Sequence, residues 1–127
     1  MERKMSYEEF TYRVGEPITD EYGKSPIIPV FSLLQGKWRL SVIYALLCLG
    51  TTRFGQIEKF CEPITPAALN TVLRDLIQAG IVEKTTAEGD PHPYYGLTDK
   101  GRDFMPCFYE MMNWGFTYRT PKSKTKK

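Results

Sequence analysis

Residues 53–95 read RFGQIEKFCEPITPAALNTVLRDLIQAGIVEKTTAEGDPHPYY, and the order of structural elements in this stretch decides the fold. Its hydrophobic pattern predicts a helix, a tight turn, a second helix and then two β-strands joined by a loop. This order is typical of a winged helix-turn-helix, in which the β-hairpin is the wing. We therefore expect a mainly α-helical domain with a small β-hairpin wing.

The second helix of this motif has the clearest boundaries. Thr65 is a good N-cap, and Pro66 suits the first helical position, where its missing N–H costs nothing. Ile64 and Leu69 flank the cap at the spacing of a hydrophobic staple, and Gly80 supplies the left-handed residue that ends a helix. The apolar residues that recur at helical spacing and are expected to face the core are Leu69, Val72, Leu73 and Leu76.

The neighbouring elements are predicted from shorter signals. The first helix is expected to begin at Thr51 and to end before Pro63, because the residue before a proline disfavours helical backbone. Residues 81–85 alternate as a strand, residues 87–91 have the composition of a turn, and residues 94–97 form the returning strand. The inward-facing residues of the first helix are expected to be Phe54, Ile57 and Phe60.

The chain before the motif is expected to contain two helices. Residues 1–24 form an extension, in which Ser6 and Glu9 have the spacing of a capping box and indicate one short helix. Residues 27–50 are apolar with a helical period, which predicts a single, mostly buried helix. Cys48 lies inside that run, so we interpret it as a small buried hydrophobic residue.

Residues 98–118 predict a final helix, kinked or broken at Pro106. This helix carries more apolar surface than a small domain can cover by itself, so we expect it to associate with a second subunit. The apolar residues concerned are Phe104, Met105, Phe108, Met111, Met112, Trp114 and Phe116.

Composition excludes several classes of protein. The 127 residues, 42% of them hydrophobic, suffice for one core, and no apolar run of about 18 residues could cross a bilayer. The N-terminus has no secretory signal pattern, and three cysteines without CxxC spacing indicate neither a disulfide framework nor a zinc site. The single histidine, His92, lies in the wing, and no catalytic or phosphate-loop motif occurs. We expect a cytoplasmic protein that is not an enzyme and binds no cofactor or metal.

The net charge of +2 is unevenly distributed. Residues 1–24 carry four basic and six acidic groups, residues 25–118 eight and nine, and residues 119–127 five and none. The core is therefore not basic, and any affinity for nucleic acid must come from local placement of cations. Two roles remain open for the basic tail: it adds to the affinity for nucleic acid, or it is a disordered, solvating end. The candidate cations are Lys37, Arg39, Arg53, Arg74 and Lys84.

The second helix exposes side chains that can read bases in a major groove. Asn can bond bidentately to adenine, Thr and Ala methyls can pack on thymine methyls, and Arg can reach guanine or a phosphate. These residues are Ala67, Ala68, Asn70, Thr71 and Arg74. The alternatives are a winged helix that uses this face for protein contacts without binding DNA, and a dimer that binds a small molecule between its subunits.

The chain resembles the HxlR-type winged-helix transcription regulators over roughly residues 25–118. The resemblance rests on GKW at 36–38, RF at 53–54, LT at 97–98 followed by Gly101, and WG at 114–115. It implies a sequence-specific transcriptional regulator that binds palindromic operator DNA as a homodimer, through N- and C-terminal dimerisation helices and without a cofactor. A small-molecule effector of unknown identity is compatible with it.

The resemblance also assigns DNA-binding residues and exposes two departures. Thr65, Ala67, Asn70, Thr71 and Arg74 match the reading helix, Lys37 and Arg53 match positions for backbone contacts, and His92 stands where the family usually has a wing arginine. With Glu88 and Asp90 nearby, we expect wing binding that is weaker or pH dependent. Members that sense oxidants use a cysteine thirteen positions before the GKW tryptophan, and that position is Ser25, which implies that no thiol switch operates there.

Overall fold

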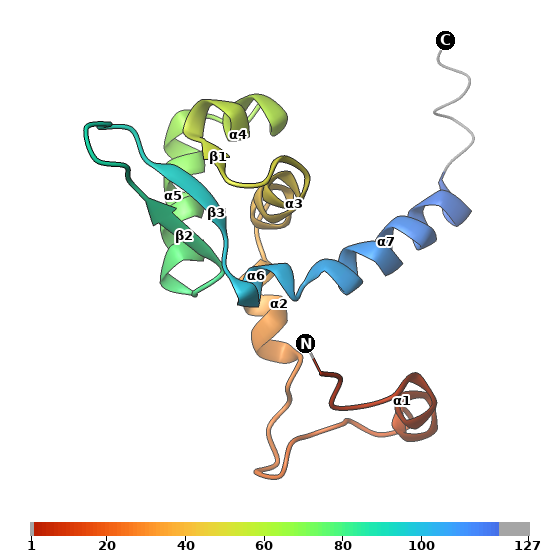
Figure 1. Cartoon of the computed structure of the whole chain (residues 1–127). Coiled ribbons are helices and arrows are strands. Elements are labelled where there is room, and N and C mark those ends of the chain that lie inside the picture. The colour runs from red at the N-terminus through yellow and green to blue at the C-terminus, as the bar shows by residue number, and fades with distance from the viewer. Residues whose placement is uncertain (1, 120–127) are drawn as a thin grey trace.

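The computed structural model describes residues 2–119 as a mainly helical domain with a small antiparallel sheet (Figure 1). Residues 120–127 of the predicted basic tail lie outside the described residues. The helices are α1 (Tyr7–Arg13), α2 (Ile28–Leu34), α3 (Arg39–Leu49), α4 (Phe54–Phe60), α5 (Pro66–Gln78), α6 (Asp99–Arg102) and α7 (Met105–Tyr118). The strands are β1 (Thr52–Arg53), β2 (Val82–Thr85) and β3 (Tyr94–Leu97).

The predicted boundaries of α5 are confirmed. The Thr65 hydroxyl accepts a hydrogen bond from the backbone N–H of Ala68 at 3.1 Å, and Pro66 is the first helical residue. Gly80 follows the helix with φ of +79°, a backbone conformation that favours glycine. Ile64 and Leu69 are both buried, as a hydrophobic staple requires. Local sequence signals therefore fix both ends of this helix.

The prediction that Thr51 and Thr52 open a helix is wrong. Thr52 and Arg53 form strand β1, which pairs antiparallel with β3 so that Thr52 faces Tyr95 and Arg53 faces Tyr94. The wing is thus the outer part of a three-stranded sheet of order β1-β3-β2 and not a separate two-stranded ribbon. Pairing with β3 extends the backbone at residues 52–53, so α4 begins at Phe54.

The prediction of one helix across residues 27–50 is also wrong. The run divides into α2 and α3, with Gly36 between them at φ of +99°. Arg39 holds the two helices to α5: its guanidinium donates to the Leu33 carbonyl at 2.7 Å and to the Asp75 carboxylate at 2.8 Å. The left-handed backbone at Gly36 breaks the helix, and Arg39 fixes the resulting corner.

The core lies between α3, α4, α5 and the sheet. It contains Ile43, Ile57 and Leu69, with the predicted stripe of α5 fully included. Phe60, predicted to face inward, is 42% exposed and packs edge-on against Tyr44. It lies at the edge of the core, against the half-buried ring of Tyr44.

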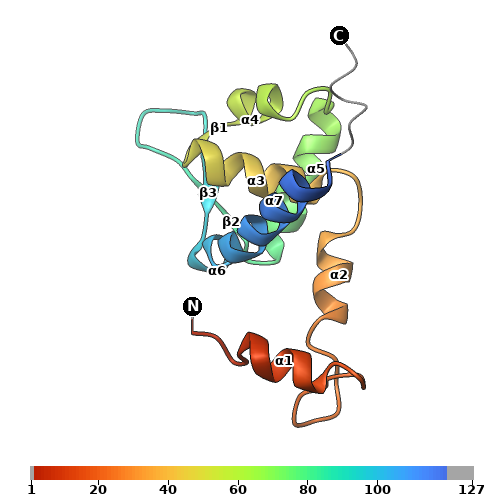
Figure 2. The ribbon, with the colours of Figure 1, turned by 90° about the vertical axis from the view of Figure 1, so that its right-hand side faces the viewer.

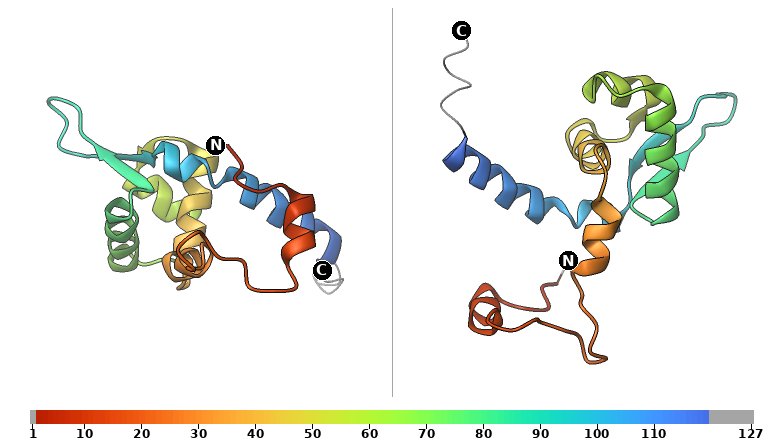
Figure 3. Two further views of the ribbon diagram at one scale, coloured as in Figure 1. Left: turned by 90° about the horizontal axis from the view of Figure 1, so that it is seen from below. Right: turned by 180° about the vertical axis from the view of Figure 1, so that it is seen from behind.

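Helix α7 lies on the side of α3 opposite to α5 and the wing (Figures 1 and 3), and α1 lies below the rest of the domain, beyond α2 (Figure 2). The Ser6 hydroxyl accepts from the Glu9 backbone N–H at 3.0 Å, which confirms the capped helix α1. The predicted break at Pro106 is confirmed as well, because α6 ends at Arg102 and Pro106 lies in the first turn of α7. Neither α1 nor α7 has a buried residue.

Candidate nucleic-acid interface

Helix α5 presents a continuous exposed face opposite its buried stripe. Ala67, Asn70, Thr71 and Arg74 occupy positions i, i+3, i+4 and i+7, so they share one side of the helix, and all four are exposed. The Thr71 hydroxyl donates to the Ala67 carbonyl at 3.1 Å, which leaves its methyl group and oxygen lone pairs for a partner. This face has the residue types that hydrogen-bond and pack against base edges.

Two sequence assignments on α5 change in detail. Ala68, expected to be exposed, is half-buried and packs against the core, because it lies one position from buried Leu69. Thr65 is exposed, but its hydroxyl oxygen accepts the N-cap hydrogen bond. Its hydroxyl hydrogen is still able to donate to an acceptor such as a phosphate oxygen.

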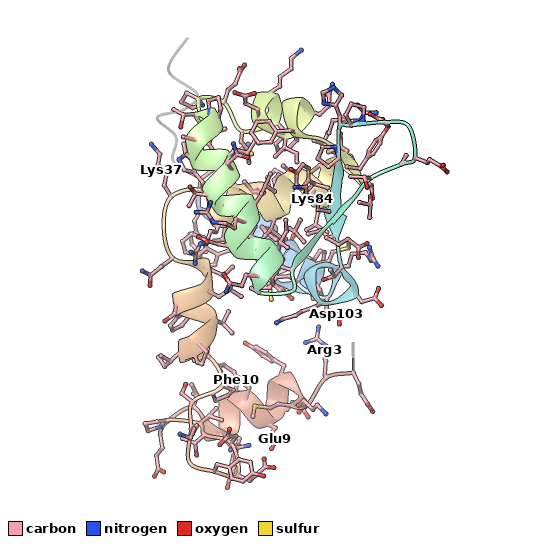
Figure 4. The ribbon with its side chains drawn as sticks, turned by 90° about the vertical axis from the view of Figure 1, so that its left-hand side faces the viewer. Arg3, Glu9, Phe10, Lys37, Lys84 and Asp103 are labelled. Carbon is pink, nitrogen blue, oxygen red and sulfur yellow. The ribbon has the colours of Figure 1, made fainter. Side chains whose placement is uncertain are left out.

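Lysines flank α5 on both sides. Lys37 lies in the turn between α2 and α3, exposed, with its ammonium 5.0 Å from the centre of the Trp38 ring. Lys84 lies on β2 and is also exposed. Figure 4 shows Lys37 on one side of α5 and Lys84 on the other, with α5 facing the viewer between them. A polyanion that contacts the exposed face of α5 would therefore meet positive charge at both edges.

Arg53 does not point freely to solvent. Its guanidinium donates to the Asp90 carboxylate at 2.6 Å and to the Tyr94 hydroxyl at 2.8 Å, and lies 4.3 Å from the centre of the Tyr94 ring. The hydrogen bond with Tyr94 and the negative charge of Asp90 raise the pKa of Arg53 above its usual value. Its Nε is buried and has no hydrogen-bond partner among residues 2–119. Arg53 therefore ties the wing to the start of α4, a role that the sequence did not reveal.

His92 lies near the tip of the wing and is exposed. Its backbone N–H donates to the Asp90 carboxylate at 3.0 Å, so the same carboxylate orders both the tip and Arg53. Asp90 and Tyr94 were missed as functional candidates. The pairing of Arg53 with Tyr94 across β1 and β3 is the signal that would have found them, but it requires the sheet register.

The cysteines differ from expectation at one position. Cys48 is exposed, because the last turn of α3 extends beyond the elements that cover its middle, so the prediction of a buried residue is wrong. Its hydrogen bond with Tyr44 is the main cause of a raised pKa at that tyrosine. Cys61 is buried, which raises the pKa of its thiol, whereas Cys107 is exposed.

Within residues 2–119, no three His, Cys, Asp or Glu side chains are grouped so that they could hold a metal ion. In the same range, no helix combines the length and the hydropathy needed to span a bilayer.

The winged-helix fold and the exposed polar face of α5 define a DNA-binding class of protein. The chain belongs to the HxlR-like helix-turn-helix family, which matches residues 33–123. The resemblance inferred from the sequence motifs is thereby confirmed.

Similar proteins are transcriptional regulators. The HTH-type transcriptional regulator YdzF of Bacillus subtilis is 30% identical over 99 residues, which cover 77% of this chain and 91% of YdzF. The redox regulator HypR in its reduced form is 30% identical, with a TM-score of 0.69 over 79% of this chain and 99% of HypR. The reduced form of the transcriptional regulator YodB from B. subtilis is 32% identical, with a TM-score of 0.64 over 73% of this chain and 91% of YodB. These similarities support a DNA-binding transcriptional regulator, which is a non-enzymatic role.

Proposed function

We propose that the protein is a homodimeric regulator that binds a palindromic operator in a sequence-specific manner. The observation that carries this proposal is the exposed face of α5, formed by Ala67, Asn70, Thr71 and Arg74 on a helix whose opposite side is fully buried. The buried stripe holds the helix rigidly, so its outer side chains are positioned for base edges in a major groove.

The residues around α5 divide between base and backbone contacts. Asn70 reads adenine, and the methyl groups of Ala67 and Thr71 pack on thymine. Thr65 and Lys37 contact phosphates at the edge of the groove. Arg53 contributes by holding the wing, through its contacts with Asp90 and Tyr94, and His92 approaches the DNA backbone from the wing tip. The acidic groups Glu88 and Asp90 weaken that last contact.

Dimerisation is supported by the apolar surface of α7. Its exposed hydrophobic residues are Met105, Tyr109, Met111, Met112, Trp114, Phe116 and Tyr118. Soluble monomers rarely expose so many large hydrophobic side chains on one helix, so we infer that a second copy of the chain buries them. Because α7 and α1 lie away from α5, two subunits joined there leave both reading helices exposed (Figure 3). Half-sites one helical turn apart, about 34 Å, would then be read together.

The runner-up is a winged helix that binds a protein partner through α5 and no DNA. One experiment separates the two functions: selection from a random pool of duplex DNA, followed by sequencing. The regulator predicts an enriched inverted repeat, whereas a protein-interaction module enriches no sequence. Sedimentation at micromolar concentration tests the dimer, which should have twice the mass of the chain. A clean monomer would contradict the proposed assembly.

A further inference from the structure

A cleft lies between α5 and the sheet, beside the face proposed to read bases. Its volume is about 420 Å³, and it is lined by Asn70, Leu73, Arg74, Ile77, Lys84 and Tyr95. We propose that this cleft binds one phosphodiester of the DNA backbone, held by Arg74 and Lys84. The inference rests on the proposed function and assigns Lys84, together with Arg74, to phosphate binding.

The charge of the cleft suits an anion. Its lining contains two cations and no carboxylate. Leu73 and Ile77 supply apolar surface, which reduces the water that competes for the two cations. Each cation is carried by an ordered element and lies next to a buried residue. Lys84 lies opposite buried Tyr95 in the β2–β3 register, and Arg74 follows buried Leu73 on α5.

Both cations are available for a ligand. Throughout residues 2–119, neither Arg74 nor Lys84 forms an ion pair, although Arg39 and Arg53 are each bound to an aspartate. Arg39 and Arg53 are thus used to hold the fold together. Arg74 lies on α5 and Lys84 on β2, yet both line the same cleft. No acidic partner among residues 2–119 explains why the two cations lie there.

The position of the cleft matches the path of a DNA strand. Arg74 follows Ala67 by seven residues, which is about 10 Å along the helix axis. If the first turns of α5 lie against base edges, Arg74 therefore reaches the border of the major groove, where the phosphates run. Lys84 is on this side of α5 and Lys37 on the other (Figure 4), so the two lysines would contact the two strands that border the groove.

The experiment uses the full-length protein and the selected operator. A set of duplexes is made, each with a single phosphate replaced by a neutral methylphosphonate, and affinities are measured for wild type and for Lys84→Gln and Arg74→Gln. Lys24→Gln is the control, because it removes the same charge from the irregular segment between α1 and α2. Lys24 and Lys84 are both exposed, and melting curves verify that all variants are folded.

We expect one phosphate in each half-site at which the methylphosphonate weakens wild-type binding about tenfold, as loss of a charged hydrogen bond does. For the Lys84→Gln protein, a methylphosphonate at that same phosphate should lower the affinity less than about twofold. The Lys84→Gln substitution should also lower the slope of log affinity against log salt by about one unit. Arg74→Gln should show the same coupling at the same phosphate, and Lys24→Gln none.

Other outcomes overturn the inference in distinguishable ways. Failure of wild type to bind any duplex would remove the proposed function and the inference with it. Binding by Lys84→Gln equal to that of Lys24→Gln, or a methylphosphonate profile unchanged by Lys84→Gln, would leave the regulator intact and disprove the phosphate site. A parallel titration with inorganic phosphate against chloride of equal ionic strength tests for a small-anion site. NMR shifts at Lys84 with inorganic phosphate, without coupling to any DNA phosphate, would assign the cleft to a free anion instead.

Discussion

Gly101→Ala should destabilise the fold because no space exists for its methyl group. A Cβ at Gly101 would overlap the Ile81 carbonyl oxygen and lie 3.0 Å from Leu97 Cδ2. That carbonyl accepts hydrogen bonds from the Thr98 backbone N–H at 3.0 Å and from its hydroxyl at 3.2 Å, so moving it disturbs both. Overpacking costs about 1–3 kcal/mol and each weakened hydrogen bond about 1 kcal/mol, against about 1 kcal/mol gained in helix propensity.

The net loss is about 2–4 kcal/mol, which corresponds to a fall of about 7–15 °C in melting temperature for a domain of this size. Thermal unfolding at one fixed protein concentration measures it, because the proposed dimerisation would make the midpoint depend on concentration. Gly55→Ala is the matched control: nothing lies within 4 Å of a Cβ at that helical position, so it should leave stability unchanged or raise it slightly. Equal melting temperatures for Gly101→Ala and wild type would refute the packing of α6 against the sheet described here.

Two further predictions concern the wing and the signal. Asp90→Asn removes the ion pair to Arg53, so we expect faster hydrogen exchange across residues 86–93. Because the pair is partly exposed to solvent, its loss should lower global stability only slightly. Unchanged exchange would show that Arg53 does not order the wing. Operator binding should be insensitive to diamide, since Ser25 has no thiol. Its hydroxyl instead accepts hydrogen bonds from the backbone N–H groups of Ile27 and Ile28 at the start of α2. A band-shift assay with and without oxidant measures this. Release of wild type by diamide, but not of Cys107→Ser, would identify Cys107 as a sensor.

The parts of the fold that sequence predicted are those set by neighbouring residues. Helix α5 was placed correctly because its N-cap, its first-turn proline and its terminal glycine are all local signals. The face of α5 followed from helical periodicity alone. Four of the five residues named for it are exposed, and the fifth, Ala68, is half-buried against the core.

The parts that sequence missed depend on contacts between distant residues. Strand β1 forms because Thr52 and Arg53 pair with a strand more than 40 residues later, and no local pattern marks so short a segment. The corner between α2 and α3 is fixed by Arg39 through Asp75, again across the chain. The Arg53–Asp90 ion pair likewise joins residues far apart in the chain. The sequence therefore did not show that Arg53, expected to contact DNA, binds the wing.

A second DNA selection, carried out with Asn70→Ala, tests whether α5 reads bases. If Asn70 reads adenine, the variant should lose the preference for that base in each half-site and bind the original operator about 1–3 kcal/mol more weakly. Lys37→Ala, selected in parallel, should keep the sequence preference and weaken all duplexes alike, with a salt slope lower by about one unit. If Asn70→Ala enriches the same operator as wild type with the same affinity, this face of α5 does not read the sequence.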